Sequence, residues 1–110
     1  MTELPLDPAT FAELEAAAGA AFARELIATF LEEAPLMLAE LRSTLAAGNA
    51  DAFRRAAHSL KSNSLTFGAL ALGAMARELE TKGMSGTVSL DALAGEYTRA
   101  AAALTALRDA

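Results

Sequence analysis

The sequence contains no cysteine, a single histidine, three prolines and only 5% aromatic residues in 110 positions. Without cysteine the chain cannot form disulfides or thiolate metal sites, which fits a reducing compartment. One histidine cannot complete a closed zinc site of the usual kind, and the carboxylates do not follow an EF-hand spacing. The glycines occur singly, which excludes the phosphate-cradling loops of nucleotide-binding proteins. We therefore expect this chain to bind no cofactor and no metal.

Long apolar runs are also missing. No stretch approaches the roughly eighteen uninterrupted apolar residues that a membrane span needs. The first residues, MTELPLDPATF, lack the basic and apolar regions of a signal peptide. The net charge of −5 argues against nucleic acid as a partner, because binding to a phosphate backbone needs basic side chains over a broad face. We expect a monomeric cytoplasmic protein that contacts neither membrane nor nucleic acid.

Apolar residues, alanine above all, are what the sequence has in abundance, at a fraction of 54%. This fraction is ample for one core in a chain of this length, and no polar linker divides it, so we expect a single domain over residues 1–110. The composition also lacks runs of alternating β-branched residues. It therefore favours close-packed helices over a sheet.

Helical spacing of apolar residues predicts the elements of this fold. Asp7 and Pro8 suit the N-cap and first position of a short helix. The helix that carries the histidine is expected to start from a cap at Asn49 or Asp51 and to end at Gly68. The other predicted helices cover residues 8–18, 21–47, 70–81 and 90–108, with a loop at 82–86. The fold class is therefore all-α, an antiparallel up-and-down four-helix bundle with a short additional N-terminal helix.

The long helix contains Pro35, which removes one backbone hydrogen bond. The apolar stripe stays in phase across this proline, so we expect a kink there and not an end. The residues of that stripe are Ile27, Phe30, Ala34, Leu38, Leu41 and Leu45. Leu36 lies about 160° from Leu38 on the helical wheel and is expected to be exposed.

The histidine, His58, is predicted to lie on the outer face of its helix. The opposite face carries the small and apolar residues Phe53, Ala56, Ala57, Leu60, Ser64 and Phe67. Around His58, at the positions where helical side chains become neighbours, lie Arg54, Arg55, Lys61, Ser62 and Leu65. No acidic residue occurs between Asp51 and Glu78, so we expect a local basic patch in which the histidine faces water among cations. Such a patch would steer an acidic pocket toward His58.

A neutral imidazole nitrogen is a nucleophile, and cations beside it would meet the oxygens of a phosphoryl group. Lys61, one turn after His58, has a flexible stem that can bring its ammonium to such an oxygen. A lone histidine on a polar helix face is, however, usually an ordinary surface residue. Leu36 and Leu65, if both are exposed, are candidates for a partner's apolar contact, although single exposed leucines are common too.

The sequence from His58 to Ala69, HSLKSNSLTFGA, resembles the histidine-containing phosphotransfer (Hpt) domains of bacterial phosphorelays, whose motif reads His-x-Leu-Lys-Gly. The resemblance extends through residues 30–61 and 72–80. One position departs from the motif, because Ser62 stands where the family usually has glycine. Its side chain could crowd an approaching partner, or its hydroxyl could donate to a phosphoryl oxygen.

The resemblance implies that His58 is the phosphoryl acceptor and that Lys61 stabilises the phosphoryl group. It implies that the partners are receiver domains of response regulators or hybrid histidine kinases, and that the Mg²⁺ of the reaction belongs to the receiver. Arg54, Arg55, Ser62, Leu65 and Leu36 would contribute to docking. On this interpretation the chain is a phosphoryl carrier without catalytic activity of its own. The alternative is a helical adaptor that binds a receiver or kinase domain without carrying phosphate.

Overall fold

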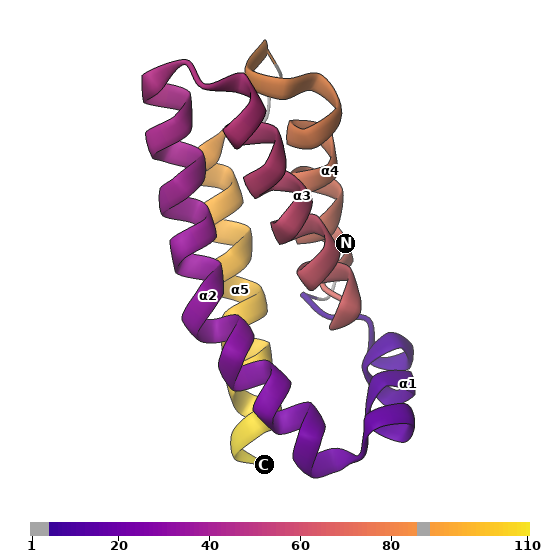
Figure 1. Ribbon diagram of the computed structural model, residues 1–110. Coiled ribbons are helices and arrows are strands. Elements are labelled where there is room, and N and C mark those ends of the chain that lie inside the picture. Colours follow the sequence, from indigo (N-terminus) through magenta and orange to yellow (C-terminus); the bar gives the residue numbers. More distant parts are fainter. Residues whose placement is uncertain (1–4, 86–88) are drawn as a thin grey trace.

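The chain folds into a bundle of helices in the computed structural model, which describes residues 5–85 and 89–110. The elements are α1 (Pro8–Ala18), α2 (Ala20–Ala47), α3 (Ala50–Thr66), α4 (Leu70–Lys82), the 3₁₀ turn η1 (Gly83–Ser85) and α5 (Leu90–Asp109). Figure 1 shows α2 to α5 running alternately up and down, with α1 beside the end of the bundle where α2 begins. The predicted fold class is therefore confirmed. Within the predicted loop at 82–86, Lys82 is instead the last residue of α4, and Gly83–Ser85 forms the η1 turn. Gly86 lies outside the described residues.

Capping residues account for most of the helix starts. The backbone N–H of Thr10 donates to the Asp7 carboxylate at 3.3 Å, and the N–H of Ala52 donates to the Asn49 side chain at 3.2 Å. Ser89 accepts in the same way at the start of α5. Each cap satisfies a backbone donor that has no partner within the helix. Asn49, and not Asp51, is thus the cap of the histidine-bearing helix α3.

The second helix, α2, continues through Pro35 from its first residue to its last, as the sequence predicts. Its apolar stripe differs from the prediction at the C-terminal end. Leu45 is 41% exposed, and Thr44 is buried in its place. The Thr44 hydroxyl donates to the carbonyl of Glu40 at 2.6 Å, so its burial leaves no donor unsatisfied.

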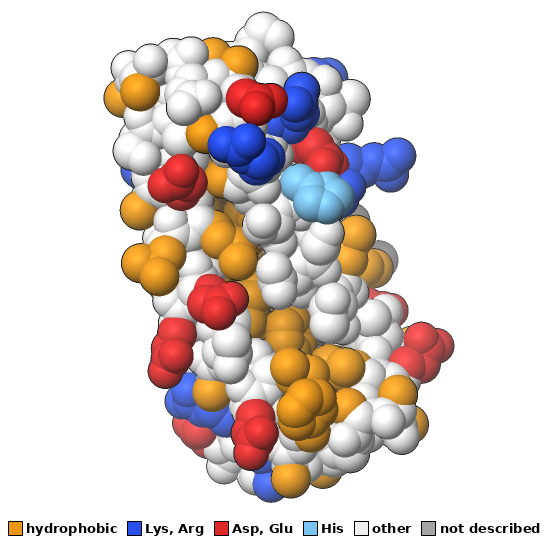
Figure 2. Space-filling view, viewed as in Figure 1, with side chains coloured by type: hydrophobic (Ala, Val, Ile, Leu, Met, Phe, Trp, Pro, Cys, Tyr) orange, Lys and Arg blue, Asp and Glu red, His pale blue; other side chains and the backbone are white. Residues whose placement is uncertain are grey.

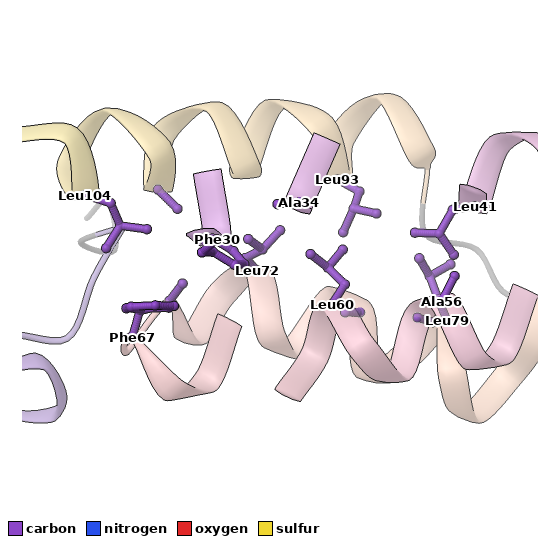
Figure 3. Packing of buried hydrophobic residues seen from close by; sticks show 14 of the residues in the cluster. Phe30, Ala34, Leu41, Ala56, Leu60, Phe67, Leu72, Leu79, Leu93 and Leu104 are labelled. Atoms are coloured by element: carbon purple, nitrogen blue, oxygen red, sulfur yellow. The ribbon is translucent and has the colours of Figure 1, made fainter. Parts of the chain in front are cut away.

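The core lies between the four long helices, where leucine and phenylalanine side chains interdigitate with alanines (Figure 3). Each long helix contributes to it; the fully or nearly fully buried large residues include Phe30, Leu41, Phe53, Leu60, Leu72, Leu79, Leu93 and Leu104. The inner face of α3 is the one predicted, down to the buried Ser64, whose hydroxyl donates to the carbonyl of Leu60 at 2.6 Å. Burial of this face turns the opposite face of α3, with His58, toward solvent.

Gly68 joins the end of α3 to the N-terminal segment. Its φ of 80° lies in the left-handed region that glycine adopts without strain. Its carbonyl accepts a hydrogen bond from the N–H of Asp7 at 2.7 Å. A Cβ at this position would lie 2.9 Å from the backbone oxygen of Asp7, closer than van der Waals contact allows. The absence of a side chain at residue 68 therefore lets the start of the chain pack against the α3–α4 turn.

Gly68→Ala is expected to destabilise the protein more than Gly48→Ala. Gly48 also has a positive φ, 69°, but a Cβ there meets nothing within 4 Å. In the control variant, Gly48→Ala, the free energy of unfolding should fall only by the cost of holding alanine in the left-handed conformation, about 1 kcal/mol. The Gly68 variant should lose roughly 1–3 kcal/mol more, because backbone must move to relieve the contact. Urea unfolding of both variants measures the difference, and equal midpoints would contradict this account of the turn.

Candidate functional site

His58 projects from the middle of α3 with 59% of its side chain exposed. The turn before it carries Arg54 and Arg55, and the turn after it carries Lys61 and Ser62. A shallow hollow beside the ring is lined by Arg54, Arg55, Ser59 and Glu80. The imidazole is thus accessible to a partner while it remains part of a group of polar side chains.

Glu80, on the neighbouring helix α4, is the residue that the sequence analysis missed. Its carboxylate contacts the Nδ1 atom of His58 through Oε2 and accepts a hydrogen bond from the Lys61 ammonium at Oε1, at 2.5 Å. Figure 2 shows an acidic side chain directly against the histidine, with cations nearby. His58 does face water near Arg54, Arg55 and Lys61, but the expected basic patch did not include this carboxylate. A carboxylate from another helix holds one edge of the ring.

The register of α3 against α4 explains this contact. A Cβ built on Gly73 of α4 would lie 2.6 Å from Cδ2 of Leu65 on α3, so the two helices meet closely at this pair. Two turns back along α3 lead from Leu65 to His58, and two turns forward along α4 lead from Gly73 to Glu80. Because the helices are antiparallel, both steps go in the same direction. On a helical wheel of α4, Glu80 lies next to the buried Leu79, so the sequence places it near the buried face of that helix. Only the pairing of α3 with α4 shows that its carboxylate contacts His58.

Glu80 is ionised at neutral pH. The hydrogen bond from Lys61 is the main cause that lowers the pKa of the Glu80 carboxyl below its ordinary value, and the hydrogen bond and charge of His58 lower it further, against an opposing contribution from burial. Its side chain is only 22% exposed. An ionised carboxylate can accept but not donate, so the proton of this contact belongs to Nδ1 of His58. In the neutral ring the lone pair is then on Nε2.

The two arginines before His58 are also paired with an acid. Arg54 and Arg55 contact the Asp51 carboxylate at 2.6 and 3.4 Å, and all three side chains are largely exposed. The basic patch predicted from the sequence is therefore charge-compensated. Asp51 neutralises part of it from the first turn of α3, and Glu80 does so from α4.

Of the other residues predicted to dock a partner, Leu36 lies in a second hollow, between α2 and α3. This hollow is lined by Glu33, Leu36, Met37, Glu40, Ala52, Arg55, Ala56 and Ser59. Leu36 is 69% exposed, as predicted. Arg55 and Ser59 line both hollows. The hollow between α2 and α3, called the α2–α3 groove below, therefore leads from the apolar side chains of α2 to the histidine.

Leu65 and Ser62 lie on the other side of the histidine along α3. Leu65 is 42% exposed and rests against Gly73. Ser62 is exposed on the turn after His58, where its carbonyl accepts a hydrogen bond from the Thr66 hydroxyl at 3.0 Å. The two exposed leucines expected to meet a partner are therefore separate: Leu36 lines the α2–α3 groove, and Leu65 covers a contact between α3 and α4.

Comparison with known protein families identifies the family of this chain. The Hpt domain profile matches residues 25–110. The chain belongs to the Hpt domain family. Its structure is similar to the crystal structure of histidine-containing phosphotransfer protein B (HptB) from Pseudomonas aeruginosa PAO1, with a TM-score of 0.88 and 26% sequence identity over 98% of this chain and 97% of that one. A search of curated proteins found no significant match.

Histidine phosphotransfer in a phosphorelay is the function of this family, and receiver domains are its partners. In this Hpt domain His58 and Lys61 share the Glu80 carboxylate. Within the described residues, no helix combines the length and the apolar character needed to cross a bilayer.

The Glu80 network should make stability depend on pH in a defined window. The pKa of Glu80 is lowered in the folded protein from an ordinary value of 4.5. The contribution of this carboxylate to the stability of the fold is therefore fully present above about pH 4.5, and it is lost as the pH falls through the pKa that Glu80 has in the folded protein. Glu80→Gln should therefore lower the unfolding midpoint at pH 7, and this deficit should shrink below pH 4. The control is Glu78→Gln, which removes a charge whose exposed pair with Lys82 lies on the same helix. Thermal unfolding from pH 3 to 7 measures both, and a deficit independent of pH would contradict the assignment.

Proposed function

We propose that His58 accepts a phosphoryl group from the aspartyl phosphate of one receiver domain and passes it to the aspartate of another. The observation that carries this proposal is the geometry of the ring. Glu80 accepts the hydrogen bond from Nδ1, so the neutral imidazole has its lone pair on Nε2. The side chain of His58 is 59% exposed. A receiver domain can therefore bring its phosphoryl group to a nucleophile that is already in the reactive tautomer.

The chemical step requires little from this chain beyond orientation. The Nε2 lone pair forms a bond to phosphorus as the bond between phosphorus and the aspartyl oxygen breaks, and the carboxylate leaves on the receiver. The proton on Nδ1 stays beside Glu80 throughout. Lys61, whose Nζ lies 2.5 Å from Glu80 Oε1, is close enough to the ring to turn its ammonium toward a phosphoryl oxygen. The Mg²⁺ of the reaction would be held by the receiver domain.

The groove between α2 and α3 is the best candidate for docking. The apolar side chains of Leu36 and Met37 line it on α2, together with Glu33 and Glu40, and Arg55 lines it on α3. A receiver surface with an apolar contact for Leu36 would approach along this groove and reach His58. Charges of both signs at the rim would favour one orientation of the partner over others.

The alternative function is a helical adaptor that binds a receiver or kinase domain without carrying phosphate. The docking groove would serve an adaptor equally well, and Ser62 in place of the family's glycine is the feature that favours it. A carrier and an adaptor differ in whether His58 becomes phosphorylated, so the histidine decides between them.

His58→Gln should abolish phosphoryl uptake while leaving binding to the receiver nearly unchanged. Glutamine keeps an amide that can contact Glu80 but has no nucleophilic ring nitrogen. The measurement is transfer of radiolabelled phosphate from each phosphorylated receiver domain of the source organism, with the acid stability of the label recorded. An acid-labile label on the parent and none on the variant is the expected result. Equal labelling of the variant would place the phosphoryl group on another residue and overturn the role of His58, whereas no labelling of the parent by any receiver would favour the adaptor.

Leu36→Asp should weaken receiver binding about tenfold or more, because it replaces an exposed apolar side chain of the groove with a charge. Phe22→Asp is the matched control. Phe22 is on the same helix and 52% exposed, but it lies roughly 21 Å away along the axis. Titration calorimetry with the cognate receiver compares the two variants. Comparable losses in both, or none in either, would place docking elsewhere.

A further inference from the structure

The Glu80 carboxylate also affects the protonation of the His58 ring once that ring is phosphorylated. When Nε2 of His58 binds phosphorus, Nδ1 still carries the proton that it donates to Glu80, so the phosphorylated ring is a cation. If this proton is lost, the ring becomes neutral, and the imidazole that departs in the next transfer would be an anion. A ring that stays protonated departs instead as neutral imidazole, with the bonding electrons returned to Nε2. The charge state of Nδ1 therefore controls how readily the phosphoryl group leaves.

We propose that Glu80 keeps the Nδ1 atom of phosphorylated His58 protonated and thereby holds the phosphoryl group in a labile, transfer-ready state at neutral and mildly alkaline pH. This inference rests on the proposed function of His58 as the acceptor and adds a positioning residue to it. The carboxylate lies on a different helix from the histidine, in direct contact with the ring nitrogen that does not react. An anion in that place favours the protonated ring over the neutral one.

The other charged groups around the ring do not replace this effect. Arg54 and Arg55 line the hollow beside His58 from α3, and both disfavour a cationic ring, although Asp51 compensates them in part. On α4, Arg77 lies one turn before Glu80 and is exposed. From α2, Glu33 and Glu40 line the groove beyond Arg55 and Ser59. Among these groups Glu80 is the anion in hydrogen-bond contact with the imidazole.

Lys61 introduces a second effect that the test must separate. In the unphosphorylated domain its ammonium is bound to Glu80. A phosphoryl group on Nε2 offers oxygens that compete with Glu80 for that ammonium, and removal of the Glu80 charge would leave Lys61 entirely to the phosphoryl group. Stronger binding of Lys61 would also lengthen the lifetime of phosphohistidine. It would do so without moving the pH at which the phosphohistidine becomes labile.

The experiment follows the loss of phosphohistidine as a function of pH after labelling with phosphoramidate, which needs no partner protein. In this labelling Nε2 binds phosphorus and ammonia leaves. ³¹P NMR between pH 5 and 10 measures the rate of loss and identifies the labelled nitrogen. In Glu80→Gln, where an amide oxygen can still accept from Nδ1 but carries no charge, the midpoint of the pH profile should move down by about one unit. The lifetime at pH 8 should then rise about tenfold.

Two further variants make the result specific. Glu78→Gln removes the same charge from α4 at an exposed pair with Lys82 and should leave the profile of the parent unchanged. Lys61→Met, alone and combined with Glu80→Gln, removes the competing ammonium, and the shift in midpoint should persist in the combined variant. A longer lifetime without a shift in midpoint would assign the effect to the lysine. A shift that disappears in the Lys61→Met background would show that the charge of Glu80 does not act on the ring by itself, and either result would overturn the proposal.

Failure of this inference can be distinguished from failure of the proposed function. A parent labelled on Nε2 whose pH profile is the same as that of Glu80→Gln overturns only the role of Glu80. Labelling on Nδ1 overturns the inferred orientation of the ring, while transfer from a receiver would still show His58 to be the acceptor. Absence of labelling by both phosphoramidate and phosphorylated receivers overturns both.

Discussion

The close packing of α3 against α4 is the constraint on which the site depends. Gly73 has no side chain, and Leu65 of α3 rests in the space that a Cβ there would take. The two helices are antiparallel, and two turns away from this contact the same register places Glu80 against His58 and Lys61. The site is therefore assembled from a nucleophile and a cation on one helix and a carboxylate on another. All three side chains lie on helices, so the geometry of the site depends on how α3 and α4 pack.

Compensation of charge is the second property of this surface. The cations near His58 have acidic neighbours, with Asp51 beside Arg54 and Arg55, and Glu80 beside Lys61. The exposed pairs of Asp51 with Arg54 and Arg55 contribute little to stability. They do prevent a strong local positive potential that would attract anions without regard to their identity. Under the proposed function, recognition of a partner would depend on docking in the groove beside Leu36, and the cations would act at short range once the partner is in place.

Most of the fold could be predicted because its determinants are local. Apolar spacing and caps such as Asp7 and Asn49 depend on residues within a few positions of one another, and the predicted helices match the observed ones to within a residue or two at most ends. The failure at Leu45 has a tertiary cause. Near the end of α2 the apolar stripe rotates relative to the neighbouring helices, so Thr44 becomes buried and the leucine exposed. A helical wheel describes one helix alone, so it cannot predict where the neighbouring helices lie.

The sequence by itself determined that His58 lies on the exposed face of a helix with Lys61 one turn later, because both follow from the period of the helix and from the motif around them. It did not determine what lies against the ring. Glu80 is 22 residues from His58, and its contact depends on the antiparallel register of two helices, which is set by side chains that meet elsewhere along them. The tertiary structure thus decided which ring nitrogen carries the proton, since only the packed helices bring the carboxylate to the imidazole.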